Sequence, residues 1–460
     1  MSTERDPFKL TSIDEKGSRI GIIPAEVRGK FRKWRTRVHF LLIIFFLLLP
    51  WIKIDGHQAL LLNIPQREFN FFGVLLRAHD APLVFLVFAI LVMGLAFATA
   101  IWGRGWCGWA CPQTVFIDFV FRRIEHWVEG DYIQRRRMQR ENWDFKTRIK
   151  NILKWILFVF ASSLIAHSFV AYFVGSNNLL DMIQGSPKEN WQYFLLISVI
   201  TGLILFDFAW FREQFCVIMC PYGRIQSVLL SSNSLAIVYD EKRGEPRRQR
   251  ASLNEKSGDC VSCNRCIEVC PTRIDIREGL QMECIACTAC ADACDEIMAK
   301  VKKPPGLIAY RTLDGKPKKY FKLKTLFYGF GIFLSVTSLA YNLITREPLN
   351  IAVLRGTEAP FIIYQGDNGE NRIRNHFRLH LTNQTDQEAH YRIELEEQND
   401  FQMILAQNPI TLRANSSETV HFFVHVPAEK IIGVKSIKIA LIDSKGVRFV
   451  RELTFVGPAK

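Results

Sequence analysis

Residues 260–270 read Cys-Val-Ser-Cys-Asn-Arg-Cys-Ile-Glu-Val-Cys, and residues 284–294, thirteen residues further on, read Cys-Ile-Ala-Cys-Thr-Ala-Cys-Ala-Asp-Ala-Cys. Each run is C-x2-C-x2-C-x3-C, in which three thiolates on one tight loop can each reach a different iron of a cubane cluster. The fourth cysteine lies on the next turn, points the other way and completes the other cluster. Zinc is the alternative metal, but it takes two pairs of ligands around one ion. The pattern therefore predicts two iron–sulfur clusters.

This stretch of about forty residues resembles the two-cluster module of bacterial ferredoxins. On that pattern one 4Fe-4S cluster is held by Cys260, Cys263, Cys266 and Cys294. The second 4Fe-4S cluster is held by Cys284, Cys287, Cys290 and Cys270.

The same chain carries five apolar segments long enough to cross a bilayer, which needs roughly twenty such residues. They lie at about 40–51 with its flanks, 83–101, 155–174, 193–211 and 326–343. The 23% of charged residues is therefore an average over membrane spans and polar domains. No cleavable signal peptide is expected, because the N-terminal region carries Asp and Glu and no small-residue cleavage site follows the first apolar run.

Lysine and arginine gather on alternate sides of these spans. The first 37 residues carry ten and residues 102–152 another ten, whereas residues 52–82 carry three and residues 175–190 carry one. Because basic loops stay in the cytoplasm, we expect a multi-pass protein of a bacterial inner membrane, with its N-terminus and ferredoxin module inside and its C-terminus in the periplasm. The net charge of +14 then reflects topology and contact with anionic lipid headgroups, and no nucleic-acid partner is expected.

The expected fold class is a multidomain α+β membrane protein with five transmembrane helices, an inserted two-cluster bacterial-type ferredoxin module and a C-terminal Ig-like β-sandwich. The expected domains are a basic cytoplasmic arm (1–37), a four-helix membrane domain (38–230), the ferredoxin module with basic flanks (231–322), a fifth transmembrane helix (323–345) and a periplasmic β-sandwich (346–460). The sandwich is predicted from short segments that alternate apolar and polar residues between polar turns.

The remaining four cysteines form two C-x3-C-P motifs, each of which follows a span. They are Cys107 and Cys111 before Pro112, and Cys216 and Cys220 before Pro221. The motifs lie 109 residues apart, which predicts a parallel internal repeat of residues 30–130 and 145–230. If the backbone there is helical, the two cysteines of a motif share a face, and two such faces can present four sulfurs together. A soft metal site is preferred, since thiolates favour Cu(I), zinc or iron–sulfur clusters, while packing cysteines and a cycling dithiol remain alternatives.

Five spans, two C-x3-C-P motifs, a dicluster ferredoxin and an external C-terminal domain resemble the cytochrome c oxidase accessory family called CcoG, FixG or RdxA over nearly the whole chain. The resemblance implies reduction of Cu(II) to Cu(I) for assembly of a cbb(3)-type oxidase, and it leaves the occupant of the C-x3-C-P cysteines open. Proteins resembling NapH share the motifs but lack the C-terminal domain. Regulators resembling NosR carry a large flavin domain before the first span, for which about 37 residues leave no room.

Isolated polar residues within the spans are further candidates. Asp207 lies in the fourth span, where a carboxylate is costly, so it is either functional or paired with Arg212 or Arg104. His39 and His167 lie at different depths, which disfavours a haem. The C-terminal domain carries histidines that we expect at its surface, with copper binding as the alternative. They are His376, His380, His390, His421 and His425.

The expected function is electron transfer by a membrane-bound iron–sulfur protein that acts as a cupric reductase. A cytoplasmic donor supplies the electrons, the C-x3-C-P cysteines contact copper, and the external domain contacts the oxidase or one of its assembly factors. One alternative is a quinol-linked electron-transfer subunit resembling NapH. Another is a non-enzymatic assembly scaffold whose clusters are structural or sense redox state. The sequence names neither the donor, the direction of electron flow, the cluster potentials nor the oligomeric state.

Overall fold

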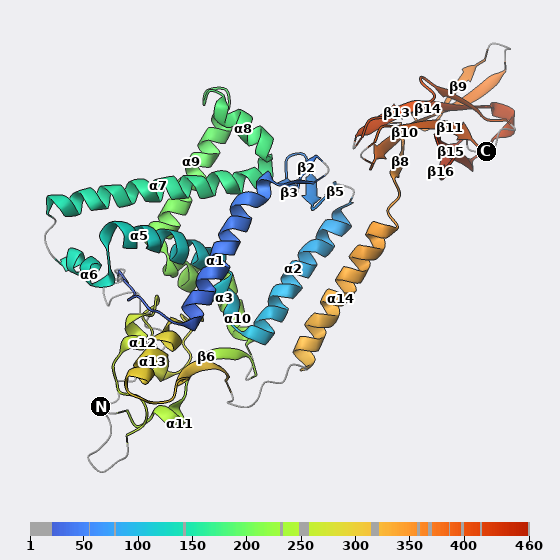
Figure 1. Cartoon of the computed structure of the whole chain (residues 1–460). Coiled ribbons are helices and arrows are strands. Elements are labelled where there is room, and N and C mark those ends of the chain that lie inside the picture. Colours follow the sequence, from blue (N-terminus) through green and yellow to red (C-terminus); the bar gives the residue numbers. More distant parts are fainter. Residues whose placement is uncertain are drawn as a thin grey trace. The chain divides into compact units, whose positions relative to one another are not determined.

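The computed structural model of the chain describes residues 21–458 except for short stretches (Figure 1). These stretches are 55, 78–79, 141–143, 231–232, 248–256, 314–321, 357–358, 367–369, 386, 397–399 and 415. The first twenty residues of the expected basic arm therefore lie outside the described residues. The chain divides into two compact units, Met1–Ala340 and Tyr341–Lys460.

Five helices of the described chain are long and apolar enough to cross a membrane, as predicted. They are α1 (Lys30–Leu48, continued by the 3-10 turn η1, Leu49–Trp51), α2 (Ala81–Trp102), α7 (Phe145–Val174), α9 (Trp191–Leu205, continued by the π-helical turn η4, Phe206–Phe211) and α14 (Leu323–Ile344). Half of the apolar window of α7 is buried in the protein, against 6% for α2 and none for α14. Helix α7 is thus the one around which the first unit packs, while α2 and α14 leave apolar side chains for lipid to cover.

Helix α1 begins at Lys30, about ten residues before the predicted apolar segment. Its first turns carry Arg32 and Arg35, which both bind the carboxylate of Asp118. The helix therefore extends beyond its apolar stretch because its basic residues find a buried partner within the protein.

Short elements connect the long helices. Between α1 and α2 lie the strands β1 (Lys53–Ile54), β2 (His57–Gln58), β3 (Leu60–Asn63), β4 (Glu68–Phe71) and β5 (Val74–Leu76). Between α2 and α7 lie α3 (Gly105–Trp109), α4 (Pro112–Phe116), the π-helical turn η3 (Ile117–Phe121), α5 (Arg122–Glu129) and α6 (Tyr132–Arg140). Helix α8 (Ser176–Gln184) precedes α9, and the π-helical turn η5 (Phe215–Met219) and α10 (Pro221–Leu229) follow η4.

Aromatic packing holds the segments that surround the C-x3-C-P motifs together. The ring of Phe121 in η3 lies 4.9 Å from that of Phe158 in α7 and 5.5 Å from that of Phe208 in η4. All three side chains are buried. The two halves of the predicted repeat therefore meet in one apolar core.

The ferredoxin module begins and ends with a pair of antiparallel strands, β6 (Leu235–Tyr239) and β7 (Ile308–Thr312). Between them lie α11 (Glu241–Gly244), α12 (Arg265–Glu268), the 3-10 turn η6 (Ile276–Glu278) and α13 (Ala289–Lys300). Its core is small and is built around Ile237, Met298 and Leu307. Small modules with so few buried apolar residues commonly rely on bound metal for stability.

The second unit is a sandwich of two antiparallel sheets, which confirms the predicted β-sandwich. One sheet has the order β12-β14-β10-β8, with β9 also paired to β10, and the other has the order β13-β11-β15-β16. The strands are β8 (Leu349–Arg355), β9 (Ile362–Gln365), β10 (Asn371–Asn383), β11 (Ala389–Leu395), β12 (Gln402–Leu405), β13 (Ile410–Leu412), β14 (Ser417–Pro427), β15 (Val434–Asp443) and β16 (Arg448–Val456). Alternate residues such as Phe377, Leu379 and Leu381 point inward and are fully buried.

Candidate functional site

The two cysteine runs of the ferredoxin module fold as copies of one loop. Each cysteine of the first run has its counterpart 24 positions later, as Cys260 has in Cys284. Residues two and four places after the first cysteine have a positive φ in both loops. They are Ser262 (57°), Asn264 (55°), Ala286 (52°) and Thr288 (63°). Such angles are uncommon for residues other than glycine, so the same costly backbone shape is maintained twice.

Each loop borders a small cavity, and four cysteines line the first cavity and five the second. Cys260, Cys263, Cys266 and Cys294 line the first. Cys270, Cys284, Cys287 and Cys290 line the second, together with Cys266. The structure thus brings together the two sets of four, and the last cysteine of each run lies at the cavity of the other run.

The chemistry of both cavities fits iron–sulfur clusters. Burial raises the pKa of the Cys266, Cys284 and Cys294 thiols to about 12, so their thiolates need positive charge close by. Iron ions supply that charge, and thiolate is the ligand of these clusters. Arg277 adds a cation to the first cavity, where Asp275 holds its guanidinium at 2.7 Å. Sequence reasoning missed Arg277, which has no motif of its own.

The two C-x3-C-P motifs share one backbone geometry. The N–H of Cys111 donates to the carbonyl of Trp106, five residues back, at 2.9 Å, and that of Cys220 donates to Phe215 at 2.8 Å. A bond across five residues is a π-type turn, which often occurs at functional sites. Each of these cysteines then precedes the proline that starts the next helix, α4 or α10. Because the helix is broken at this point, the two cysteines of a motif do not lie on one regular helical face.

The thiols of the two motifs lie in one region. Cys107 donates to the side-chain oxygen of Gln226 in α10 over 3.5 Å. Burial first, and then the nearby thiols of Cys111 and Cys220, raise the pKa of Cys107 to about 11. Burial and the thiols of the first motif likewise raise the pKa of Cys216.

The thiols of the two motifs lie near one another, but their sulfurs are too far apart for three of them to bind a single ion. Among the described residues, no three cysteine sulfurs all lie within 4.8 Å of one another. A tetrahedral ion with metal–sulfur bonds of about 2.3 Å needs its sulfurs roughly 3.8 Å apart. The arrangement therefore suits an ion that uses fewer thiolates, or a group larger than one ion.

The turn before each motif is also repeated. Gly103 has φ 57° and ψ −124°, and Arg212, 109 positions later, has φ 51° and ψ −122°. These angles match the first corner of a type II′ turn, where glycine is preferred. A Cβ at Gly103 would lie 2.2 Å from the carbonyl oxygen of Leu235. Arg212 adopts these backbone angles although they are strained for a residue with a Cβ. Its guanidinium binds the carboxylate of Glu125.

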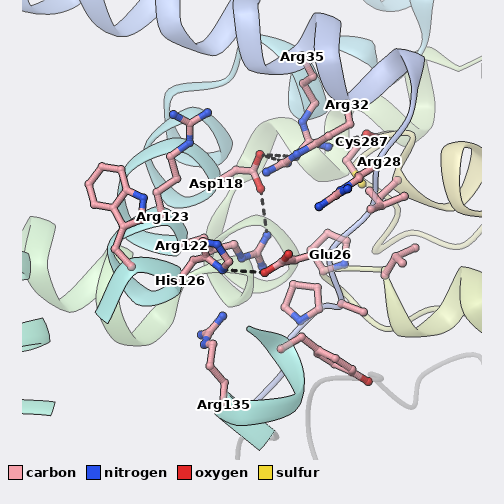
Figure 2. Close-up of a pocket in the computed structure, with 18 residues that line it drawn as sticks. Glu26, Arg28, Arg32, Arg35, Asp118, Arg122, Arg123, His126, Arg135 and Cys287 are labelled. Carbon is pink, nitrogen blue, oxygen red and sulfur yellow. Dashed lines mark hydrogen bonds and ion pairs between the residues drawn. The ribbon is translucent and has the colours of Figure 1, made fainter. Parts of the chain in front are cut away.

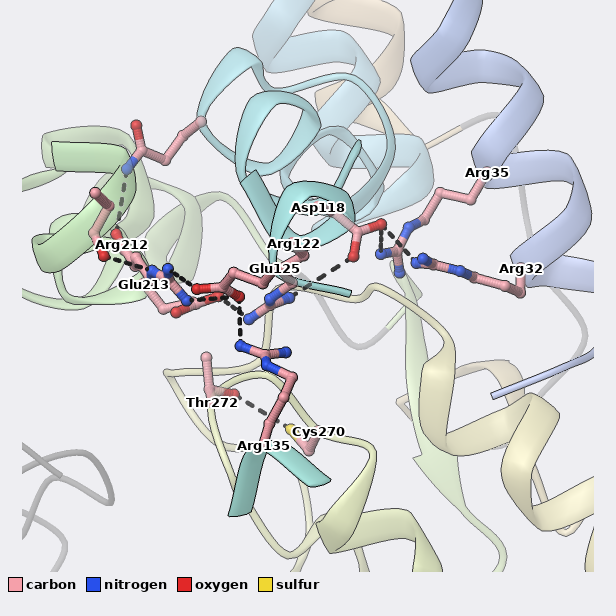
Figure 3. Close-up of polar contacts among 12 residues, drawn as sticks. Arg32, Arg35, Asp118, Arg122, Glu125, Arg135, Arg212, Glu213, Cys270 and Thr272 are labelled. Carbon is pink, nitrogen blue, oxygen red and sulfur yellow. Dashed lines mark hydrogen bonds and ion pairs between the residues drawn. The ribbon is translucent and has the colours of Figure 1, made fainter. Parts of the chain in front are cut away.

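A row of ion pairs holds the helices around the motifs in place (Figure 3). Its pairs are Asp118 with Arg32 and Arg35, Arg122 with Glu213, and Glu125 with Arg212 and Arg135. Asp118 and Glu125 are both buried, so each carboxylate depends on its cations. Sequence reasoning missed this network because its partners lie as many as 91 residues apart.

The second cysteine loop of the ferredoxin module packs directly on the first C-x3-C-P motif. A Cβ at Gly108, between the two cysteines of that motif, would lie 2.6 Å from the carbonyl oxygen of Ile285 and 2.7 Å from that of Ala286. Only glycine permits so close an approach of two backbones. The loop that lines the second cavity is therefore in contact with the motif.

Hydrogen bonds hold the same loop, two of them from the helical segments and one from strand β7 of the module itself. They run from Arg104 to the carbonyl of Cys284 (3.1 Å), from Arg35 to that of Cys287 (2.6 Å) and from Tyr310 to that of Ala286 (3.2 Å). Trp109, next to Gly108, donates to the hydroxyl of Tyr310 at 3.0 Å. Three of the four residues 284–287 thus accept a hydrogen bond at their carbonyl.

The structure gives Asp207 a different partner from those expected. Its carboxylate accepts a hydrogen bond from the side-chain amide of Gln113 at 2.9 Å. Of the two alternatives for Asp207, pairing with Arg212 or Arg104 is wrong, because Arg212 binds Glu125 and Arg104 binds the ferredoxin loop, and a functional role stays a prediction. In α7, His167 lies 2.7 Å from the carbonyl of Ser163, one turn back.

Four of the five histidines named above lie on β10 and β14, and the fifth, His390, lies on β11 in the other sheet. His376 Nε2 lies 3.0 Å from His421 Nδ1. His380 and His390 are exposed and each contacts a threonine. His425 is buried against Tyr364, so it departs from the expected surface position.

Comparison with known proteins agrees with this architecture. Residues 211–313 match a family described as 4Fe-4S dicluster domain, residues 83–130 one described as 4Fe-4S binding domain, and residues 339–458 one described as an IG-like fold at the C-terminal of FixG. The protein is 32% identical to Protein RdxB of Cereibacter sphaeroides over 88% of each chain, and 32% identical to Protein RdxA of the same organism over 82% of each. Identity to the nitrogen fixation protein FixG of Rhizobium meliloti is also 32%, over 79% of this chain and 76% of that protein.

The apolar helices, the cysteine sets and these relatives define an iron–sulfur electron-transfer protein of the membrane. Within that class, the chain belongs to the FixG/RdxA family.

Proposed function

We propose that this protein reduces Cu(II) to Cu(I) for the assembly of a cbb(3)-type cytochrome c oxidase. The approach of Gly108 to the carbonyls of Ile285 and Ala286 carries the proposal. It joins a loop of the second cysteine set to a motif whose soft thiolates favour Cu(I). Clusters bound in the two cysteine sets would store and release single electrons.

In this proposal the eight ferredoxin cysteines bind the clusters, and the four C-x3-C-P cysteines bind copper. The first cluster site is Cys260, Cys263, Cys266 and Cys294, and the second is Cys284, Cys287, Cys290 and Cys270. Cys263 is exposed, so the first set faces a cytoplasmic electron donor, while the loop of the second set faces Gly108. Cys107, Cys111, Cys216 and Cys220 bind copper as substrate, and each Cu(II) that takes up one electron leaves as Cu(I).

The test replaces the motif thiols while the ferredoxin module stays intact. Cys107→Ser with Cys111→Ser, or Cys216→Ser with Cys220→Ser, should abolish most Cu(II) reduction. Both variants should keep their ferredoxin iron and remain reducible by dithionite. The matching alanine variants keep the sites apolar and should be equally inactive. Activity that survives in the alanine variants and fails in the serine variants would assign these cysteines to packing.

A second candidate is an iron–sulfur cluster held by the same four thiols. The match of residues 83–130 to a family described as 4Fe-4S binding domain favours it, because that segment contains Cys107 and Cys111 and none of the ferredoxin cysteines. Two ferredoxin clusters alone give roughly eight irons per chain. Clearly more than eight irons in anaerobically purified protein, with the excess lost in the serine variants, would favour this candidate over copper binding.

Two other functions are separated by simple assays. A quinol-linked subunit should exchange electrons with a quinol analogue in the absence of copper. A non-enzymatic scaffold should reduce neither substrate at a useful rate and should still support oxidase assembly after its clusters are removed.

We further propose that the protein lies in a bacterial inner membrane with its ferredoxin module in the cytoplasm and its sandwich in the periplasm. The bias of Lys and Arg among the loops supports this orientation. The sandwich would then contact the oxidase or an assembly factor. A reporter that is active only in the cytoplasm should fail when fused after Lys460, and activity there would remove one span from the topology.

A further inference from the structure

A cavity with a basic wall lies between the segment before α1, helices α5 and α6, and the ferredoxin module (Figure 2). Its volume is about 380 Å³, and ligand pockets commonly measure about 300–1,000 Å³. Among the described residues that line it, six are arginines and two are carboxylates. They are Arg28, Arg32, Arg35, Arg122, Arg123 and Arg135, with Glu26 and Asp118. The wall therefore carries more positive charge than its own acids neutralise.

Two of these arginines have no carboxylate partner within the described part of the chain. Arg32, Arg35, Arg122 and Arg135 belong to the row of ion pairs already described. Arg28 and Arg123 do not, and the guanidinium of Arg123 lies over the ring of Phe119, 3.7 Å from its centre. Burial first, and then the nearby charge of Arg32, lower the pKa of Arg123. Arg123 therefore lies beside another cation and an aromatic ring, with no carboxylate of the described residues paired to it.

The wall also carries buried donors with nothing to bind. The Nε of Arg35 and the Nε of Arg122 have no hydrogen-bond partner among the described residues. The Arg35 side chain is only 5% exposed. A buried N–H without an acceptor is costly, so the polar groups of this wall are incompletely satisfied, and an anion in the cavity would relieve its excess of positive charge.

We propose that this cavity binds a phosphate group. Phosphate offers three or four acceptor oxygens and up to two negative charges, and arginine forks bind it in bidentate fashion. The group could come from an anionic lipid headgroup or from a soluble phosphate ester. The cavity lies at the N-terminal end of α1, where a spanning helix meets the headgroup layer, and Trp127 on its rim is 72% exposed. The proposal does not depend on copper as the substrate.

The test uses the iron-loaded protein in a phosphate-free maltoside detergent. One arm adds inorganic pyrophosphate, and the other adds phosphatidylglycerol to the micelles, each against sodium chloride of equal ionic strength. The unfolding midpoint should rise by about 3 °C with the ligand that fits. Native mass spectrometry should show one bound molecule that survives gentle activation.

Matched variants decide whether the cavity is responsible. Arg28→Gln with Arg123→Gln removes two charges from the cavity without breaking a described ion pair, and it should weaken binding by about tenfold or more. Arg140→Gln with Arg148→Gln removes two charges from exposed positions outside the cavity and should bind as the parent does. Arg28→Lys with Arg123→Lys keeps the charge, loses the fork and should be intermediate. Iron content, measured in all three, shows whether a variant is folded.

Each outcome bears on the proposal. A response to phosphatidylglycerol alone identifies a lipid site, and a response to pyrophosphate identifies a soluble ligand, provided that the cavity variant loses it. No response to either probe overturns the proposal. Equal responses in the cavity variant and in its exposed control also overturn it, because they would reflect general charge attraction rather than this cavity.

Discussion

The protein contains two repeated cysteine motifs that are built on different scales. In the ferredoxin module the repeat is 24 residues long, and both copies use the same loop with the same pair of positive φ angles. In the helical part the repeat is 109 residues long, and each copy contributes one π-type turn and one proline. The short repeat is symmetric in detail. The long repeat is not, since a glycine in one copy corresponds to Arg212 in the other.

The difference shows how much of a site can be encoded locally. Three cysteines of each ferredoxin set lie within seven consecutive residues, so one loop nearly completes a set. The C-x3-C-P motifs each supply two thiols, and these meet only because α7, η3 and η4 share a core. The short repeat can tolerate changes elsewhere in the chain, whereas the long one depends on contacts between distant segments.

The largest expected effect tests whether the two cysteine runs of the ferredoxin module exchange their fourth ligands. Cys270→Ser should remove the cluster of the second set and leave the first, so that iron falls from roughly eight to roughly four per chain. Iron analysis with electron paramagnetic resonance of the reduced protein measures this. Loss of the signal assigned to Cys260, Cys263 and Cys266 instead would show that the fourth ligands are not exchanged between the runs.

The next effect concerns the ion pairs that support the long repeat. Burial alone would raise the pKa of Glu125, but Arg212 and Arg135 outweigh it and hold this pKa at about 2. An acid with a lowered pKa in the folded state stabilises the fold above its unfolded value of 4.5, and this contribution is lost as the pH falls towards 2. Glu125→Gln should therefore cost about 3 kcal/mol at pH 7 and progressively less below pH 4.5.

Circular dichroism of thermal unfolding in detergent measures the stability difference between parent and variant at pH 7 and pH 3.5. Glu189→Gln, at an exposed loop position, is the control and should change little at either pH. A difference for Glu125→Gln that does not shrink at the lower pH would contradict the assigned ion pairs.

A third change probes the contact where the two repeats meet. Gly108→Ala places a Cβ where the carbonyls of Ile285 and Ala286 lie, so the ferredoxin loop must move away from the motif. Cu(II) reduction should fall by roughly tenfold, while iron content is unchanged. Gly94→Ala in α2, which meets nothing within 4 Å, should have parental activity. Parental rates in both variants would show that the contact is not needed for the reaction.

The smallest effect concerns the asymmetry of the long repeat. Arg212→Ala and Arg212→Gly both lose the ion pair with Glu125, but only glycine adopts the turn without strain. The glycine variant should therefore be more stable by about 1 kcal/mol, as judged by denaturant unfolding. At the matching position, Gly103→Ala should be destabilising, because its Cβ would meet the carbonyl of Leu235. Equal stabilities for the two Arg212 variants would mean that the backbone there relaxes.

Much of the architecture could be read from patterns along the chain. The apolar segments predicted five long helices, and the alternation in the C-terminal region predicted the sandwich, because both signals depend on neighbours within one element. The limits of α1 were missed, since the charged start of that helix is stabilised by Asp118, far along the chain. The suggested pairing of Asp207 with an arginine was wrong for the same reason, because its actual partner, Gln113, is also distant in the sequence.

The two cysteine sets of the ferredoxin module were predictable from the sequence alone, because the expected ligands of one cluster are mostly a few residues apart and their spacing is the signal. The sequence was also enough to find the segments that are apolar enough for a membrane. Three other features became visible only in the folded chain: the contact of Gly108 with the ferredoxin loop, the position of Arg212 in a turn that favours glycine, and the cavity lined by six arginines. These features join segments tens to hundreds of residues apart, and no local pattern of residues records which distant surfaces pack together.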